Sequence, residues 1–219
     1  MPPRSAQASA ICGLLAGPVL FLGTLAGTLA QPDEFSIVNH PSSDLGAMTA
    51  DSPWLSNVRS NLAGLLLFVF AVGLWRSLGR RPAARIGSVL VGLAAVATFL
   101  TGVFRLDCRE IDEGCEPVSS WHANAHIMDA GITVIAFLLA PFVLAWALRS
   151  AEGWRDLSIP TLAFAVGTIV VAVAGGVVGP GFASLSAVLV WFVWITVLAL
   201  RMLRLSRETS AIAQSLADP

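Results

Sequence analysis

Six long apolar segments constrain the fold of this chain more than any other feature. They cover about residues 9–30, 60–79, 85–104, 120–148, 158–179 and 184–205. A helix needs about 20 apolar residues to cross the hydrocarbon layer of a membrane, and each segment is about that long or longer. The sequence therefore predicts an all-α membrane protein built as a bundle of six transmembrane helices. Residues 1–207 are expected to form one transmembrane domain, and residues 208–219 a short cytoplasmic tail.

The low charge of the chain agrees with this class. Hydrophobic residues make up 56% of its 219 residues and charged residues only 12%, against about 25% in soluble domains. The formal net charge is −1, and we find no basic helix or aromatic platform of the kind that binds nucleic acid. We therefore expect membrane lipids as partners and no nucleic acid.

The distribution of arginine predicts how the helices are oriented. All 13 basic residues are arginine, and ten of them fall on one side of a six-helix topology. Cytoplasmic loops carry an excess of positive residues, so both termini are expected in the cytoplasm and the protein in the plasma membrane. The two polar loops at about 31–58 and 105–119 then face outward, and they hold nine of the 14 acidic residues.

The first apolar segment also has features of a signal peptide. Arg4 precedes it, and Thr28-Leu29-Ala30 resembles a cleavage site. Its apolar core is longer than the roughly 7–15 residues of a signal peptide. We therefore expect a retained helix, with cleavage as the alternative.

Two of the three cysteines, Cys108 and Cys115, lie in the second polar loop. If that loop faces the oxidising outer side, the short spacer between them closes easily, so we predict a disulfide. Two free thiols are the alternative. Cys12 lies in the first apolar segment and is expected to pack as a small hydrophobic residue.

Polar residues that can carry chemistry gather at the start of the fourth apolar segment. His122, His126 and Asp129 stand at i, i+4 and i+7, a spacing that places all three on one face of a helix. Ionisable groups inside a membrane are costly unless they are paired or face water. This stretch is therefore the candidate site of the chain.

One hypothesis is a metal-dependent hydrolase that acts on a lipid or lipid-linked substrate. His122 and His126 are its expected metal ligands, because histidines one helical turn apart can bind the same ion. His40 or Asp107 completes the ligand set, and zinc is the expected cofactor. Asp129 or Asp44 is the expected catalytic carboxylate, which orients the metal-bound water or a ligand.

The second hypothesis is a non-enzymatic membrane protein. The same polar side chains then form a structural network, with Arg59 and Arg105 as ion-pair partners of Asp129, and a polar pocket that binds a lipid headgroup or a partner. Either way, we expect the pocket at the outer ends of the second to fourth helices and in the two polar loops. The sequence leaves both hypotheses open.

Short motifs along the chain show a family resemblance. Ser43-Asp44-Leu45-Gly46 is followed by Pro53-Trp54-Leu55 and Asn61, and Gly102-Val103-Phe104 leads to Asp107 and a histidine-bearing helix. In these motifs the chain resembles the prokaryotic six-helix membrane family catalogued as domain of unknown function 998, over about residues 10–205. Arg105 stands where that family often has proline. The resemblance implies a six-helix fold and no particular activity.

Overall fold

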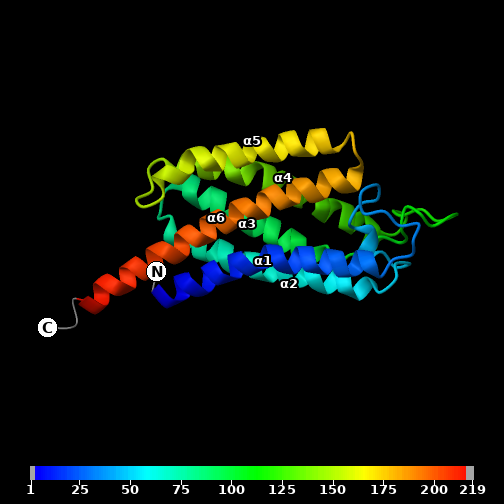
Figure 1. Cartoon of the computed structure of the whole chain (residues 1–219), viewed down its shortest axis with the longest axis horizontal. Coiled ribbons are helices and arrows are strands. Elements are labelled where there is room, and N and C mark those ends of the chain that lie inside the picture. The colour runs from blue at the N-terminus through cyan, green and yellow to red at the C-terminus, as the bar shows by residue number, and fades with distance from the viewer. Residues whose placement is uncertain (1–2, 216–219) are drawn as a thin grey trace.

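The computed structural model describes residues 3–215, which form helices and loops and no strand (Figure 1). Six of the helices are long and apolar enough to cross a membrane. Their bounds are α1 Pro3–Leu29, α2 Pro53–Ser77, α3 Pro82–Leu100, α4 Trp121–Leu148, α5 Ser158–Gly175 and α6 Pro180–Ser215. Two short 3-10 helices, η1 (Asp44–Gly46) and η2 (Arg155–Leu157), lie in the loops. The predicted six-helix fold is confirmed.

The helix ends differ from the apolar segments for local reasons. Helix α2 starts at Pro53 rather than near residue 60, because a proline at the first helical position has no N–H that needs a partner. Helix α3 ends at Leu100, and residues 101–104 form a turn. Helix α6 continues to Ser215, so residues 208–215 of the expected tail are helical and residues 216–219 lie outside the described residues.

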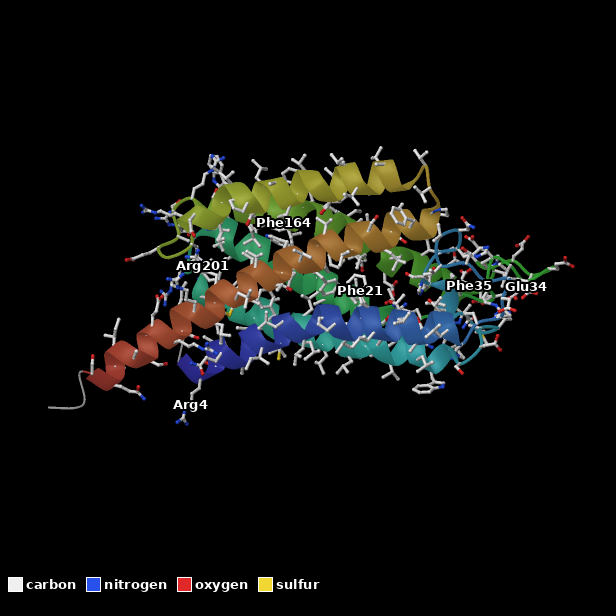
Figure 2. All side chains as sticks on the ribbon, viewed as in Figure 1. Arg4, Phe21, Glu34, Phe35, Phe164 and Arg201 are labelled. Carbon is white, nitrogen blue, oxygen red and sulfur yellow. A yellow bond between two sulfur atoms is a disulfide. The ribbon has the colours of Figure 1, made fainter. Side chains whose placement is uncertain are left out.

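The helices pack in a closed ring, each against the next along the chain and α6 against α1. Because they run alternately up and down, the chain presents two distinct ends (Figure 1). We call the end with residues 30–52 and 101–120 the disulfide end. The opposite end, with residues 78–81 and 149–157, is the arginine end. Figure 2 shows Arg4 and Arg201 at the arginine end and Glu34 and Phe35 at the disulfide end.

Aromatic side chains fill the core where α4 and α6 face each other. Phe137 stacks on Trp191 with ring centroids 3.7 Å apart, and Trp194 packs edge-on against Trp191 at 5.5 Å. Both tryptophans are fully buried. These two tryptophans therefore pack the interior of the bundle and do not anchor at its membrane interfaces.

The turn between α5 and α6 is joined to the loop after α1. The Phe182 N–H donates to the carbonyl oxygen of Val38 at 3.0 Å. Gly179 and Gly181 lie directly against the backbone of residues 37–40, where a side chain on either glycine would collide with carbonyl oxygens. This contact holds the first loop over the disulfide end of the bundle.

Candidate functional site

A cavity of about 260 Å³ lies inside the disulfide half of the bundle. Helices α1, α2, α3, α4 and α6 line it, together with Pro41, Ser42, Ser43 and Gly46 of the first loop. The ends of α2 to α4 and the first polar loop line this cavity as expected, but α1 and α6 line it as well, and no residue of the second polar loop (105–119) does. The exposed Val134 of α4 and Ser184 of α6 line its edge. Figure 2 shows Phe21, one of its apolar lining residues, within the bundle.

The only arginine that lines this cavity is Arg59, which is 8% exposed. Its Nε and Nη2 donate to Ser56 Oγ at 3.2 and 3.0 Å, Nη2 also donates to the Ser42 carbonyl oxygen at 3.2 Å, and Nη1 donates to Thr24 Oγ1. These four bonds leave at least one of the five guanidinium N–H groups. No carboxylate within the described residues pairs with Arg59, so the expected ion pair with Asp129 is not formed.

Neutral hydroxyls surround this guanidinium. Ser56, Arg59 and Ser60 stand at i, i+3 and i+4, so one face of α2 presents all three to the cavity. From α3, Thr98 adds a buried hydroxyl with no hydrogen-bond partner among the described residues. Ser56 and Ser60 were not among the residues expected at the site, although their spacing around Arg59 was a signal that could have found them.

His126 lines the same cavity from α4. It is 5% exposed, and its Nδ1 lies 2.9 Å from the carbonyl oxygen of Phe104. A carbonyl oxygen only accepts, so Nδ1 carries the proton of this bond. In the neutral ring the lone pair is then on Nε2, which can accept a hydrogen bond or take up a proton.

The other expected metal ligands do not join His126. The His122 ring packs against Trp121 and Phe104, at centroid distances of 4.4 and 5.4 Å. His40 packs on Phe35 at 5.4 Å, and its Nδ1 accepts the Ser36 N–H at 3.0 Å. Within residues 3–215 no group of three His, Cys, Asp or Glu side chains is placed to hold a metal ion. Helical spacing placed the two histidines on one face, but aromatic packing turns His122 away from ligation.

Asp107 holds the start of α4. Its Oδ2 accepts from the backbone N–H of Ser119 at 2.8 Å and of Ser120 at 2.7 Å, and Oδ1 accepts from Ser120 Oγ at 2.6 Å. Ser120 in turn caps α4 by accepting the Ala123 N–H. The bonds from Ser120 and Ser119 hold the pKa of Asp107 well below its usual range. A further bond from Ser119 Oγ to Oδ2 at 2.8 Å brings the total to four, so both oxygens of Asp107 are engaged in holding the start of α4.

The two expected catalytic carboxylates, Asp44 and Asp129, are both buried and neither lines the cavity. Asp44 lies in η1, where Oδ2 accepts the Glu110 N–H at 3.0 Å and Oδ1 has no hydrogen-bond partner in the described part of the chain. Burial raises the pKa of Asp44 to about 6. Neither carboxylate oxygen of Asp129 has a partner among the described residues.

At the disulfide end the residue that forms ion pairs is Arg109, which was not among the expected site residues. Arg109 pairs with Asp112 at 2.8 Å and Asp51 at 3.4 Å, and donates to Gln31 Oε1 at 3.0 Å. The bonds from Arg109 lower the pKa of Asp112 to about 2. Arg105, expected in an ion pair, is exposed and has none among the described residues. The predicted disulfide joins Cys108 and Cys115, with Cα atoms 6.4 Å apart.

A family model described as "Protein of unknown function (DUF998)" matches residues 14–201. The match covers all of the cavity-lining residues. No curated protein and no solved structure matches the chain.

Proposed function

The chain belongs to the DUF998 family, whose function is unknown, and from this premise and the geometry of the cavity we propose that it binds an anionic amphiphile of the membrane. The head group of that ligand, a phosphate or a carboxylate, contacts Arg59. Its apolar part lies between α4 and α6.

The charge of Arg59 carries this proposal. Removing a cation from water costs several kcal/mol unless an opposite charge compensates it. The partners of Arg59 in the protein are neutral oxygens of Ser56, Thr24 and Ser42. An anionic oxygen in the cavity would supply the missing charge, and a guanidinium matches the geometry of phosphate and carboxylate oxygens.

The lining of the cavity supports an amphiphile rather than a free ion. Hydroxyls lie on the α2 and α3 side, together with Arg59, whereas α6 contributes the apolar Leu185, Val188 and Phe192. A ligand with a polar head and an apolar chain satisfies both sides at once. The exposed Val134 and Ser184 at the edge favour entry from the membrane, between α4 and α6.

His126 supports a role for a second group on the ligand. Its Nε2 is available for a hydroxyl or a protonated phosphate oxygen of the head group. The same atom supports a second candidate function, hydrolysis of an ester-linked lipid, in which Nε2 takes a proton from water and Arg59 stabilises the developing oxyanion. This reaction is the form of the hydrolase hypothesis that the cavity favours.

The arrangement of arginines supports an orientation with the arginine end in the cytoplasm. Ten of the 13 arginines lie at that end, and the disulfide lies at the other. The cavity then belongs to the outer leaflet. A fluorescent reporter that matures only in the cytoplasm should fluoresce when fused to the C-terminus and stay dark when inserted in the loop at Gly114.

Thermal unfolding of the detergent-purified protein with soluble short-chain amphiphiles tests the proposal. Hexyl phosphate and hexanoate should raise the unfolding temperature in a saturable way, and hexylamine should not. Arg59→Gln should weaken the binding of the anions roughly 10- to 100-fold, because a charge-assisted hydrogen bond contributes about 1.5–3 kcal/mol.

Arg105→Gln is the matched control, since it removes one exposed arginine charge at the same end of the bundle. It should bind the anions as the unmodified protein does. Equal loss in both variants, or no binding by the unmodified protein, would refute the proposal. A preference between hexyl phosphate and hexanoate identifies which anionic head group the cavity takes.

A further inference from the structure

A second concavity, a groove of about 550 Å³, lies between α2 and α3 in the half of the bundle next to the arginine end. Its walls are apolar, and Arg76 is the only charged residue that lines it. The side chains that form most of the walls are Phe68, Val72, Val89, Leu93 and Val96. Four of these five are exposed on the surface of the bundle.

The groove lies where packing between α2 and α3 is looser, as two glycines along this pair of helices show. At Gly64 the helices touch, since a Cβ there would lie 2.5 Å from the Phe99 nitrogen and 2.7 Å from the Ala95 oxygen. At Gly92 a Cβ would meet only Ala71 Cβ, at 3.7 Å. Packing between α2 and α3 is therefore looser at Gly92 than at Gly64, and Gly92 adds no side chain to fill the groove.

Positive charge is concentrated where the groove ends. Four arginines, Arg76, Arg80, Arg81 and Arg85, are all exposed and form no ion pair within the described part of the chain. Residues 53–104, which include both helices, contain no acidic residue. Arg85 also lies over the Trp75 ring, 5.4 Å from its centroid. Glu152 lines a neighbouring hollow with Arg76, and Glu152 and Asp156 line another with Arg81, but neither acid forms an ion pair with these arginines in the described part of the chain. Four arginines against two acids leave this mouth cationic.

We propose that this groove binds an anionic phospholipid, with one acyl chain between α2 and α3 and the phosphate against Arg76 and Arg85. An acyl chain needs no hydrogen bonds, and the hydroxyl proton of Ser88, which lines the groove, is already donated to the Ala84 carbonyl oxygen at 2.9 Å. Arginines near a membrane surface attract anionic lipid head groups. A helix of a second, parallel copy fits less well, because it would bring the two sets of arginines together.

This lipid site is separate from the Arg59 cavity, with which it shares no lining residue. Two variants test it independently. Gly92→Leu fills the groove and leaves every arginine in place. Arg76→Gln combined with Arg85→Gln leaves the groove open and removes its charge. The control, Arg155→Gln with Arg207→Gln, removes the same charge from exposed arginines at the same end but away from the groove.

Native mass spectrometry counts the lipids that remain bound after exchange into nanodiscs of equal phosphatidylglycerol and phosphatidylcholine. The unmodified protein and the control should retain one phosphatidylglycerol with a preference of roughly tenfold or more. Both groove variants should lose it. Retention by Gly92→Leu would mean surface attraction without a groove site, and would overturn the proposal. The proposal would also be overturned if the unmodified protein were a dimer and Gly92→Leu dissociated that dimer.

Discussion

The imidazole Nδ1 of His126 and the carbonyl oxygen of Phe104 lie 2.9 Å apart, although 22 residues separate them in the chain. This bond joins the first turns of α4 to the turn that follows α3. It also fixes the ring so that Nε2 carries the lone pair in the neutral form. One interaction thus sets both the position and the tautomer of the only histidine in the cavity.

Substitution of His126 should separate the structural bond to Phe104 from the function of Nε2 in the cavity. The Asn side chain can donate from nearly the position of Nδ1, so His126→Asn should keep most of the stability and lose the Nε2 function. His126→Leu leaves the Phe104 oxygen unsatisfied and should lower the free energy of unfolding by about 1–3 kcal/mol. Unfolding in detergent measures the difference. Equal destabilisation by Asn and Leu would show that the bond to Phe104 contributes little.

Gly23 makes room for Arg59. A Cβ on Gly23 would lie 2.8 Å from Arg59 Cδ and 3.1 Å from its Cγ, so Gly23→Ala must displace the arginine stem. We expect a loss of about 1–3 kcal/mol in unfolding free energy and weaker binding of hexyl phosphate. Gly27→Ala is the control in the same helix, because its Cβ would meet Leu45 at an ordinary 3.6 Å. Similar behaviour of the two variants would contradict this account of α1.

Asp44 should make the stability of the protein fall as pH rises. Burial raises the pKa of Asp44 to about 6 in the folded protein, against about 3.9 in an unfolded chain. Between these values the folded state keeps a proton that the unfolded state releases, so unfolding becomes easier with increasing pH. Asp44→Asn removes this dependence and still offers an oxygen to the Glu110 N–H.

The measurement is thermal unfolding of both proteins at several pH values. Relative to the unmodified protein, Asp44→Asn should gain about 1 kcal/mol between about pH 4.5 and pH 7.5, once solvent screening is allowed for. A stability difference that stays constant over this range would show that Asp44 does not titrate there.

Replacement of Cys108 should lower the unfolding free energy more than replacement of Cys115. Cys108 is fully buried, whereas Cys115 is exposed. Either serine variant opens the loop, which should lower the unfolding free energy by about 2 kcal/mol. Cys108→Ser should lower it further, because it also buries a hydroxyl. Alkylation before and after reduction, read by mass, verifies the bond in the unmodified protein; full labelling before reduction would disprove it.

The sequence predicts the six helices, their order and the disulfide because these depend on local patterns. Apolar length determines which segments can span a membrane, and the short spacer between Cys108 and Cys115 makes their closure easy. The ends of the helices are less predictable. Pro53 extends α2 beyond its apolar part, and α6 continues as a mostly polar helix past Arg207.

The candidate site is less predictable because its contacts are distant in sequence. The spacing of His122 and His126 places them on one side of α4, but the loop after α3 decides their partners. The ring of Phe104 packs against His122, and the carbonyl oxygen of Phe104 accepts a hydrogen bond from His126. Likewise Arg59 was expected to find a carboxylate, and it contacts Thr24 and Ser42, which precede it by 35 and 17 residues. Nothing local in the sequence indicates these pairs.

The contact between Val38 of the first loop and the turn at Gly179–Phe182 has a consequence for biosynthesis. The ribosome makes the loop after α1 long before it makes α6, so that loop waits without its docking partner until the last hairpin has entered the bilayer. The first loop, which lies over Arg59, therefore makes its contacts with the turn before α6 only late in translation. A nascent chain released before residue 180 would carry the guanidinium but would lack α6, which forms one wall of the cavity.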